Sequence, residues 1–220
     1  DRYGGYCLEN GALRKQTKPA CGARRDAFSR AVIRAHFLAT SGEKVVGGHP
    51  LTAATDDTPS RGKWVAIDLD NHGGLPAVAA RNQRYVVHLY RKLCRLGFRP
   101  LACTWGTGGF HLWVFLDGWV DGPALHAFGA WLVADADRFG YCGHVPGDAA
   151  SGWPESNPKQ PRVPNYGNWL RFPGRHHSRN VWPIVFDGSA WVQGEAAVEH
   201  VLSLDAQPAD LIPAAAAPGV

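Results

Sequence analysis

The stretch that most constrains the fold is a short apolar run, residues 64–74, which carries two aspartates and breaks at Asn-His-Gly-Gly. An apolar run bounded by turn residues is typical of a buried strand. Asp68 and Asp70 would leave one face of that strand, with Cα atoms about 6–7 Å apart. Such close carboxylates repel unless one is protonated or a divalent cation lies between them. The pattern favours a metal site, although aspartates also commonly cap the turn after a strand.

The length and composition indicate a globular protein, for which we favour one large domain over two closely packed halves. Of the 220 residues, 45% are apolar, and none of the apolar runs approaches the length of about 20 residues that spans a bilayer. The five cysteines are scattered and form no Cys-x-x-Cys pair, which argues against a zinc site and a disulfide framework and favours a reducing, cytoplasmic setting. The net charge of +4 is too small to indicate a nucleic-acid partner by itself.

The spacing of apolar residues predicts alternating helices and strands within a domain of residues 1–205. Residues 1–22 are expected to be largely irregular, and the Ala/Pro-rich residues 206–220 to form a disordered tail or linker. The predicted elements are helices over 24–40, 77–96, 123–139 and 194–204, strands over 45–50 and on both sides of the glycines within 101–118, and a hairpin over 181–192.

A glycine cluster lies between the two strand-like runs and is followed by a histidine. The glycines of Thr107-Gly108-Gly109-Phe110-His111 predict a positive-φ turn or a close backbone approach. Backbone N–H groups of such a turn can bind phosphate oxygens, and the imidazole of His111 can donate to the same anion. An ordinary hairpin with a packed histidine explains the same residues.

Four further groups of polar residues are candidates for function. Glu155 lies four residues before Lys159. Arg175 precedes two adjacent histidines, and phosphate recognition by Arg175 and one of these histidines suits the cluster better than a shared metal ion. Asp187 precedes a glycine and fits a turn. The predicted helix over 77–96 has a basic face, which is either solvated or in contact with a nucleic-acid backbone through Arg84, Arg91 and Lys92.

The order of these motifs resembles the archaeo-eukaryotic primase superfamily, and within it the bacterial and mobile-element primase-polymerases. Ile67-Asp68-Leu69-Asp70 is similar to the family's first motif, and residues 107–114 are similar to its second. Residues 155–160, with the later Gly167-Asn168 and residues 173–177, resemble its third. The resemblance implies an α+β fold: a palm sheet like that of the RNA-recognition motif, packed with an N-terminal α/β unit, with the active site in the cleft between them.

The resemblance also implies a function and its ligands. Asp68, Asp70 and Glu155 would be catalytic and would hold two Mg²⁺ or Mn²⁺ ions, with Asp187 as the competing third ligand. Nucleotide binding would fall to Thr107, Gly109, His111, Lys159, Arg175 and His177. The expected activity is DNA primase or polymerase, joining ribo- or deoxyribonucleoside triphosphates on a single-stranded template or primer-template. A helicase or other replication domain outside this chain is a further expected partner. The expected origin is bacterial, phage or plasmid, and no membrane partner is expected.

Two other functions remain open from the residues alone. A metal-dependent nuclease also uses clustered carboxylates and histidine, and would degrade nucleic acid without nucleoside triphosphates. A catalytically silent DNA-binding module of a replication-initiation protein would bind DNA without metal-dependent turnover.

Overall fold

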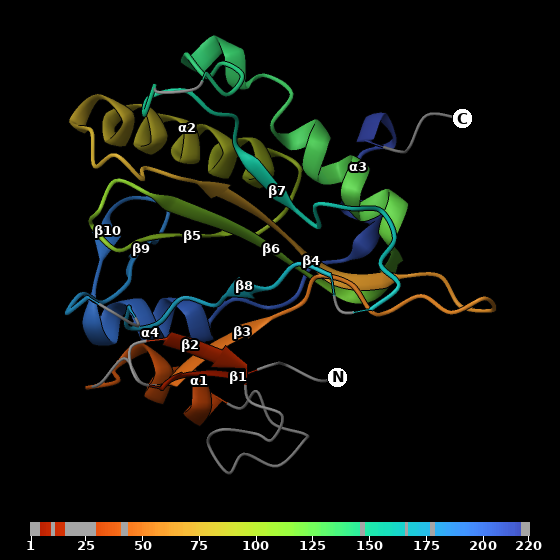
Figure 1. Cartoon of the computed structure of the whole chain (residues 1–220), viewed down its shortest axis with the longest axis horizontal. Helices are drawn as coiled ribbons and strands as arrows, with labels where there is room; N and C mark the ends of the chain where they lie inside the picture. Colours follow the sequence, from red (N-terminus) through yellow and green to blue (C-terminus); the bar gives the residue numbers. More distant parts are fainter. Residues whose placement is uncertain are drawn as a thin grey trace.

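The computed structural model describes residues 5–9, 12–15, 30–40, 44–145, 148–165, 167–176 and 179–216 (Figure 1). Its centre is a six-stranded antiparallel sheet in the order β10-β9-β5-β6-β4-β7. The strands of this sheet are β4 (Arg61–Leu69), β5 (Leu101–Thr104), β6 (Phe110–Asp121), β7 (Glu155–Asn157), β9 (Ile184–Phe186) and β10 (Trp191–Val192).

Two helices connect the central strands and cover one face of the sheet. The chain runs β4, α2 (Pro76–Arg95), β5, β6, α3 (Gly122–Leu132) and β7, and these four strands lie in the order β7-β4-β6-β5. This is the split βαβ arrangement shared by ferredoxin-like sheets. The α+β class expected from the sequence is therefore confirmed, with a β-α-β-β-α-β sheet at its centre.

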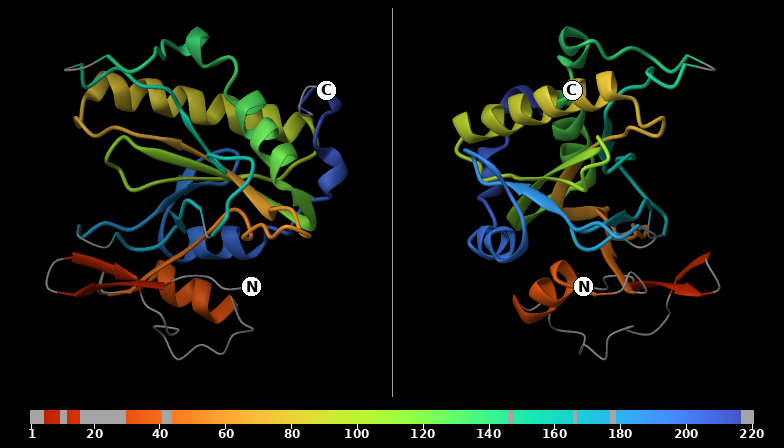
Figure 2. Two further views of the ribbon diagram at one scale, coloured as in Figure 1. Left: turned by 45° about the vertical axis from the view of Figure 1, so that its right-hand side comes forward. Right: turned by 90° about the vertical axis from the view of Figure 1, so that its left-hand side faces the viewer.

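The two faces of β4 contact different layers of the molecule. Val65 and Ile67 belong to the core cluster formed with α2 and α3, whereas Trp64 and Ala66 pack on the opposite side with Phe37. Side chains alternate along a strand, so Asp68 falls on the second face, away from α2 and α3. Figure 2 shows α2 on one side of the sheet and α1 and α4 on the other.

The second face is covered by a smaller layer drawn from both ends of the chain. Four antiparallel strands lie in the order β2-β1-β3-β8, and Gly47 of β3 pairs with Arg171 of β8. The N-terminal segment, expected to be largely irregular, thus contains paired strands. The elements of this layer are β1 (Gly5–Glu9), β2 (Ala12–Lys15), β3 (Lys44–Gly48), β8 (Leu170–Arg171), α1 (Arg30–Phe37) and α4 (Gly194–Leu202).

Several boundaries differ from those expected. The helix predicted over 123–139 ends at Leu132 and resumes as the 3₁₀ helix η1 (Ala136–Phe139), because the turn at 133–135 redirects the chain. The predicted first helix is described from Arg30 onward. Among the described residues, no helix combines the length and apolar character needed to cross a membrane.

The segment after residue 205 also differs from the expected disordered tail as far as Ala216. The backbone of Gln207 accepts from Asp117 N at 2.9 Å and donates to Phe115 O at 2.8 Å, which attaches this segment to β6. Two 3₁₀ helices, η2 (Ala209–Leu211) and η3 (Ala214–Ala216), follow. Sequence composition missed this attachment because it depends on backbone hydrogen bonds; residues 217–220 lie outside the described part.

Candidate active site

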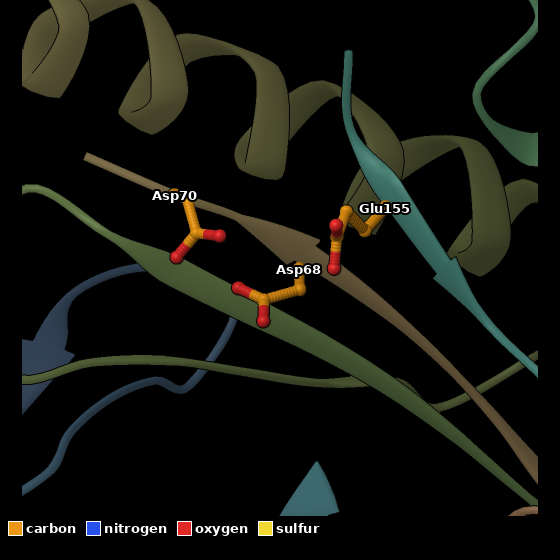
Figure 3. Close-up of side chains that lie close together, drawn as sticks. All are labelled: Asp68, Asp70 and Glu155. Atoms are coloured by element: carbon orange, nitrogen blue, oxygen red, sulfur yellow. The ribbon is translucent and has the colours of Figure 1, made fainter. Parts of the chain in front are cut away.

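The structure brings together three of the predicted acidic residues. Asp68 is next to last in β4, and its cross-strand partner in β7 is Glu155; Asp70 lies just beyond the end of β4. One carboxylate oxygen from each residue lies within 4.8 Å of those of the other two. Figure 3 shows the three side chains close together. The cluster is therefore produced by strand register between segments almost ninety residues apart in sequence.

The acidic cluster carries unfavourable charge. Burial, and then repulsion by Glu155, raise the pKa of Asp68 to about 6. The pKa of Asp70 is raised as well, mainly by burial and secondly by repulsion from the Asp68 carboxylate. Lys159 forms an ion pair with Glu155, and its charge offsets part of the rise in the pKa of Asp68. A group made only of carboxylate oxygens with excess negative charge fits a hard divalent cation such as Mg²⁺ or Mn²⁺.

His111 lies next to the acids on the other neighbouring strand. It is the β6 partner of Asp68, and its Nε2 is 3.3 Å from Asp68 Oδ1. Burial, reinforced by Arg171, lowers the pKa of His111 to about 3, so its ring is neutral at physiological pH. Its Nδ1 is buried and has no hydrogen-bond partner among the described residues. His111 can therefore offer a hydrogen bond in this site without adding a charge.

The glycine turn before His111 has the backbone that the sequence predicted. Gly106 and Gly108 have φ values of 74° and 83°, and Thr104 Oγ1 donates to Gly109 O at 2.6 Å. A Cβ on Gly108 would lie 2.6 Å from Ala79 Cβ at the start of α2 and would also collide with the Asn71 side-chain amide. The positive φ and the close approach are both confirmed; the binding of phosphate by Thr107 and Gly109 remains a prediction.

Arg171 is a further site residue that sequence analysis did not select. It lies on β8, mostly buried, with its guanidinium 4.4 Å from the centre of the Trp105 ring. Its charge lowers the pKa of Asp68 and His111, which places it near both. The sequence does indicate a special role for Arg171, because it lies inside the apolar run Trp169-Leu170-Arg171-Phe172. An arginine that such a run buries requires negative charge nearby.

The other predicted phosphate-binding residues are less closely tied to the acids. Arg175 donates to Asn180 Oδ1 at 3.0 Å and to His176 O at 3.3 Å, within its own loop. The loop touches the site indirectly, because Gly174 O accepts from Trp105 Nε1 at 2.7 Å. His177 lies outside the described residues.

The basic residues of α2 are not brought to the acids. Arg84 and Arg91 are exposed on a helix that covers the opposite face of the sheet. Lys92 donates to Trp131 O at 3.3 Å and Leu132 O at 3.2 Å, so its ammonium group joins α2 to α3. Contact of these three residues with nucleic acid remains a prediction, and any such contact would lie away from the acid cluster.

Asp187, the competing candidate for the third ligand, lies in a hairpin turn. Its Oδ1 accepts from Ser189 N and Ala190 N, each at 2.8 Å, and these backbone bonds lower its pKa to about 2. The hairpin strand β9 is separated from β4 by β5 and β6. The structure therefore groups Glu155, and not Asp187, with Asp68 and Asp70.

The raised pKa of Asp68 predicts how stability depends on pH in the metal-free protein. Folding raises this pKa from 3.8 to about 6, so the folded state binds more protons across that range and loses stability as pH rises through it. Asp68→Asn removes this loss. When the pH rises from 4 to 7.5, the free energy of unfolding of the variant should increase by about 2–3 kcal/mol relative to that of the parent. Urea unfolding in EDTA at both pH values measures the gain; parallel pH profiles would contradict the assignment.

Comparison with known proteins finds low similarity to solved structures. No family model matches the sequence, and no curated protein matches it significantly. A solved structure described as the polymerase domain of Mycobacterium tuberculosis Ligase D in complex with DNA is similar, with 14% identity and a TM-score of 0.48. The match covers 96% of this chain and 84% of that chain.

Proposed function

We propose that this chain is a metal-dependent, template-directed nucleotidyltransferase of the primase-polymerase type. The observation that supports this most is the grouping of Asp68, Asp70 and Glu155, with His111 on the strand beside them. A mostly buried Arg171 adds positive charge near the same place. Carboxylates for cations next to donors for anions form a site suited to a nucleoside triphosphate bound with its metal ions.

Each residue has a separate task in this proposal. Asp68, Asp70 and Glu155 would hold Mg²⁺ or Mn²⁺, which when bound makes a hydroxyl group more acidic and neutralises phosphate charge. His111 would donate a hydrogen bond to a phosphate oxygen. Arg171 would add a fixed charge, and Lys159 would turn from Glu155 to the phosphates once a cation takes its place. Positioning and charge neutralisation account for most of the catalysis in phosphoryl transfer.

A gel assay tests this proposal against its alternatives. It combines single-stranded DNA, labelled ribo- or deoxyribonucleoside triphosphates and Mg²⁺ or Mn²⁺, with and without an annealed primer. Products made without a primer would indicate a primase, and extension of the primer alone would indicate a polymerase. Degradation of the DNA without incorporation would favour a nuclease, and DNA binding without turnover a silent module; either would contradict the proposal.

Arg171→Ala is expected to lower kcat/KM for the nucleotide more than kcat/KM for the template. Loss of a charge beside the triphosphate should lower kcat/KM for the nucleotide by about 10–100-fold, mainly through KM. Steady-state incorporation with varied nucleotide measures this. Arg95→Ala is the matched control, because it removes an exposed arginine of α2, on the opposite side of the sheet, that has no predicted role in binding. Equal nucleotide KM values for the two variants would exclude Arg171 from the nucleotide site.

A further inference from the structure

A buried asparagine of α2 ties together the two segments that carry the site. Asn82 has no exposed surface, and its Nδ2 faces three carbonyl oxygens. These are Leu69 O at 3.2 Å and Asp70 O at 2.9 Å at the end of β4, and Gly108 O at 3.0 Å in the glycine turn. One side chain therefore spans from the backbone of a candidate metal ligand to the turn that precedes His111.

The orientation of this amide is set by a second buried residue. Tyr141 OH donates to Asn82 Oδ1 at 2.7 Å, which leaves the NH₂ group directed at the three carbonyls. Burial raises the pKa of Tyr141 far above its ordinary value, so the hydroxyl stays protonated and remains a donor. Arg81 lies 4.1 Å from the centre of the Tyr141 ring and donates to Ala150 O at 2.9 Å. Tyr141 thus holds Asn82, and Arg81 in turn packs on the Tyr141 ring.

Asp70 is the acid that most needs such support. It lies beyond the last ladder pair of β4 and β6, Leu69 with Phe110, so strand pairing does not fix its backbone. Its side chain is also half exposed. The carbonyl of Asp70 accepts the shortest of the three hydrogen bonds that Asn82 Nδ2 donates. A hydrogen bond at this carbonyl restrains the backbone from which the Asp70 carboxylate projects.

We infer that Asn82 and Tyr141 are positioning residues of this site, which hold Asp70 and the turn before His111 at the spacing that metal and nucleotide require. This inference rests on the proposed function. Neither side chain would contact the metal or the nucleotide: Asn82 acts through backbone carbonyls, and Tyr141 acts through Asn82. Outer contacts of this kind typically affect metal affinity by about 10–100-fold when they are lost, and small displacements of reacting groups lower the rate strongly.

The chain offers a closely matched pair of variants. Tyr85 and Tyr141 are neighbouring buried tyrosines, with ring centres 5.1 Å apart, and Tyr85 OH donates to Asp135 Oδ1 at 3.0 Å. Tyr141→Phe and Tyr85→Phe each delete a buried hydroxyl that donates a hydrogen bond to a side chain. Because Tyr85 donates to a carboxylate, Tyr85→Phe should lose at least as much unfolding stability as Tyr141→Phe. Only Tyr141→Phe releases Asn82 and should disturb the site.

The test is a calorimetric titration with Mn²⁺ alone, followed by incorporation assays. Tyr141→Phe should weaken Mn²⁺ binding about tenfold and lower kcat, while Tyr85→Phe should match the parent in both. Asn82→Leu should weaken binding further if it folds, and Tyr141→Phe keeps the test valid if it does not. Equal Mn²⁺ affinities for the two phenylalanine variants would overturn the inference, as would a parent that binds no Mn²⁺.

The two readouts separate this inference from the proposed function. A parent that binds Mn²⁺ but incorporates no nucleotide would refute the function, while a selective loss of Mn²⁺ affinity in Tyr141→Phe would still support the positioning role. A parent that incorporates nucleotides, with both phenylalanine variants unchanged in Mn²⁺ affinity, would refute the positioning role alone.

Discussion

Exchanging Asp68 and Asp70 together for asparagine is expected to lower nucleotide incorporation more than about a thousandfold, because charge neutralisation in the site is lost. Both side chains keep their size, so the fold should survive. Removal of the buried charge of Asp68, whose pKa is raised in the folded protein, should even stabilise the metal-free variant. Primer extension with Mg²⁺ and with Mn²⁺ measures the loss, and thermal unfolding in EDTA measures the gain.

Asp187→Asn is the control for this pair. Asp187 is an aspartate of the same sheet, but it lies in the turn between β9 and β10 and is fully exposed. Incorporation by this variant should equal that of the parent, with only a small loss of stability from the weakened turn. Incorporation by the Asp68/Asp70 variant at the parent rate would remove both residues from the catalytic role.

Gly108→Ala is expected to be the most destabilising of these substitutions. The residue has a φ of 83°, and an added methyl group would overlap Ala79 Cβ and the Asn71 amide. Left-handed strain contributes about 1–2 kcal/mol, and overpacking about 1–3 kcal/mol more. The turn before His111 should shift as a result, so activity should fall together with stability. Urea unfolding and primer extension of the same preparation measure both effects.

Gly140→Ala separates strain from overlap. Gly140 has a φ of 84°, almost equal to that of Gly108, but an added Cβ would meet nothing within 4 Å. It should therefore show the strain cost alone and retain activity. Equal losses of stability in the two variants would mean that the close approach of the glycine turn to α2 does not matter.

Local features of the site could be predicted from the sequence. The alternation around Asp68 and Asp70 predicts a strand that carries both acids, and β4 contains Asp68 but ends at Leu69, one residue before Asp70. The glycines before His111 predict a positive-φ turn, which the backbone has. These features depend on the period of a strand and on the steric freedom of glycine. Each is a property of fewer than a dozen consecutive residues.

Features that depend on distant pairing could not be predicted in the same way. Glu155 was selected through the resemblance, since its segment gives no strand signal; its place opposite Asp68 comes from pairing with β4. The position of Arg171 in the site, and the face of the sheet that α2 covers, both depend on tertiary packing. Asn82 did leave a signal, because it interrupts the apolar stripe of Val78, Tyr85 and Leu89 on α2. A polar residue inside a buried stripe indicates a specific hydrogen-bonding role.

The most direct test of the central claim, that the three clustered acids form a divalent-metal site, is a calorimetric titration of the parent and Glu155→Gln with Mn²⁺. Glu155 is brought to Asp68 only by strand pairing, so its contribution tests the site as the structure assembles it. We predict that the parent binds Mn²⁺ and that Glu155→Gln binds it at least about tenfold more weakly. A parent without Mn²⁺ binding, or a variant that binds as tightly as the parent, would contradict the account.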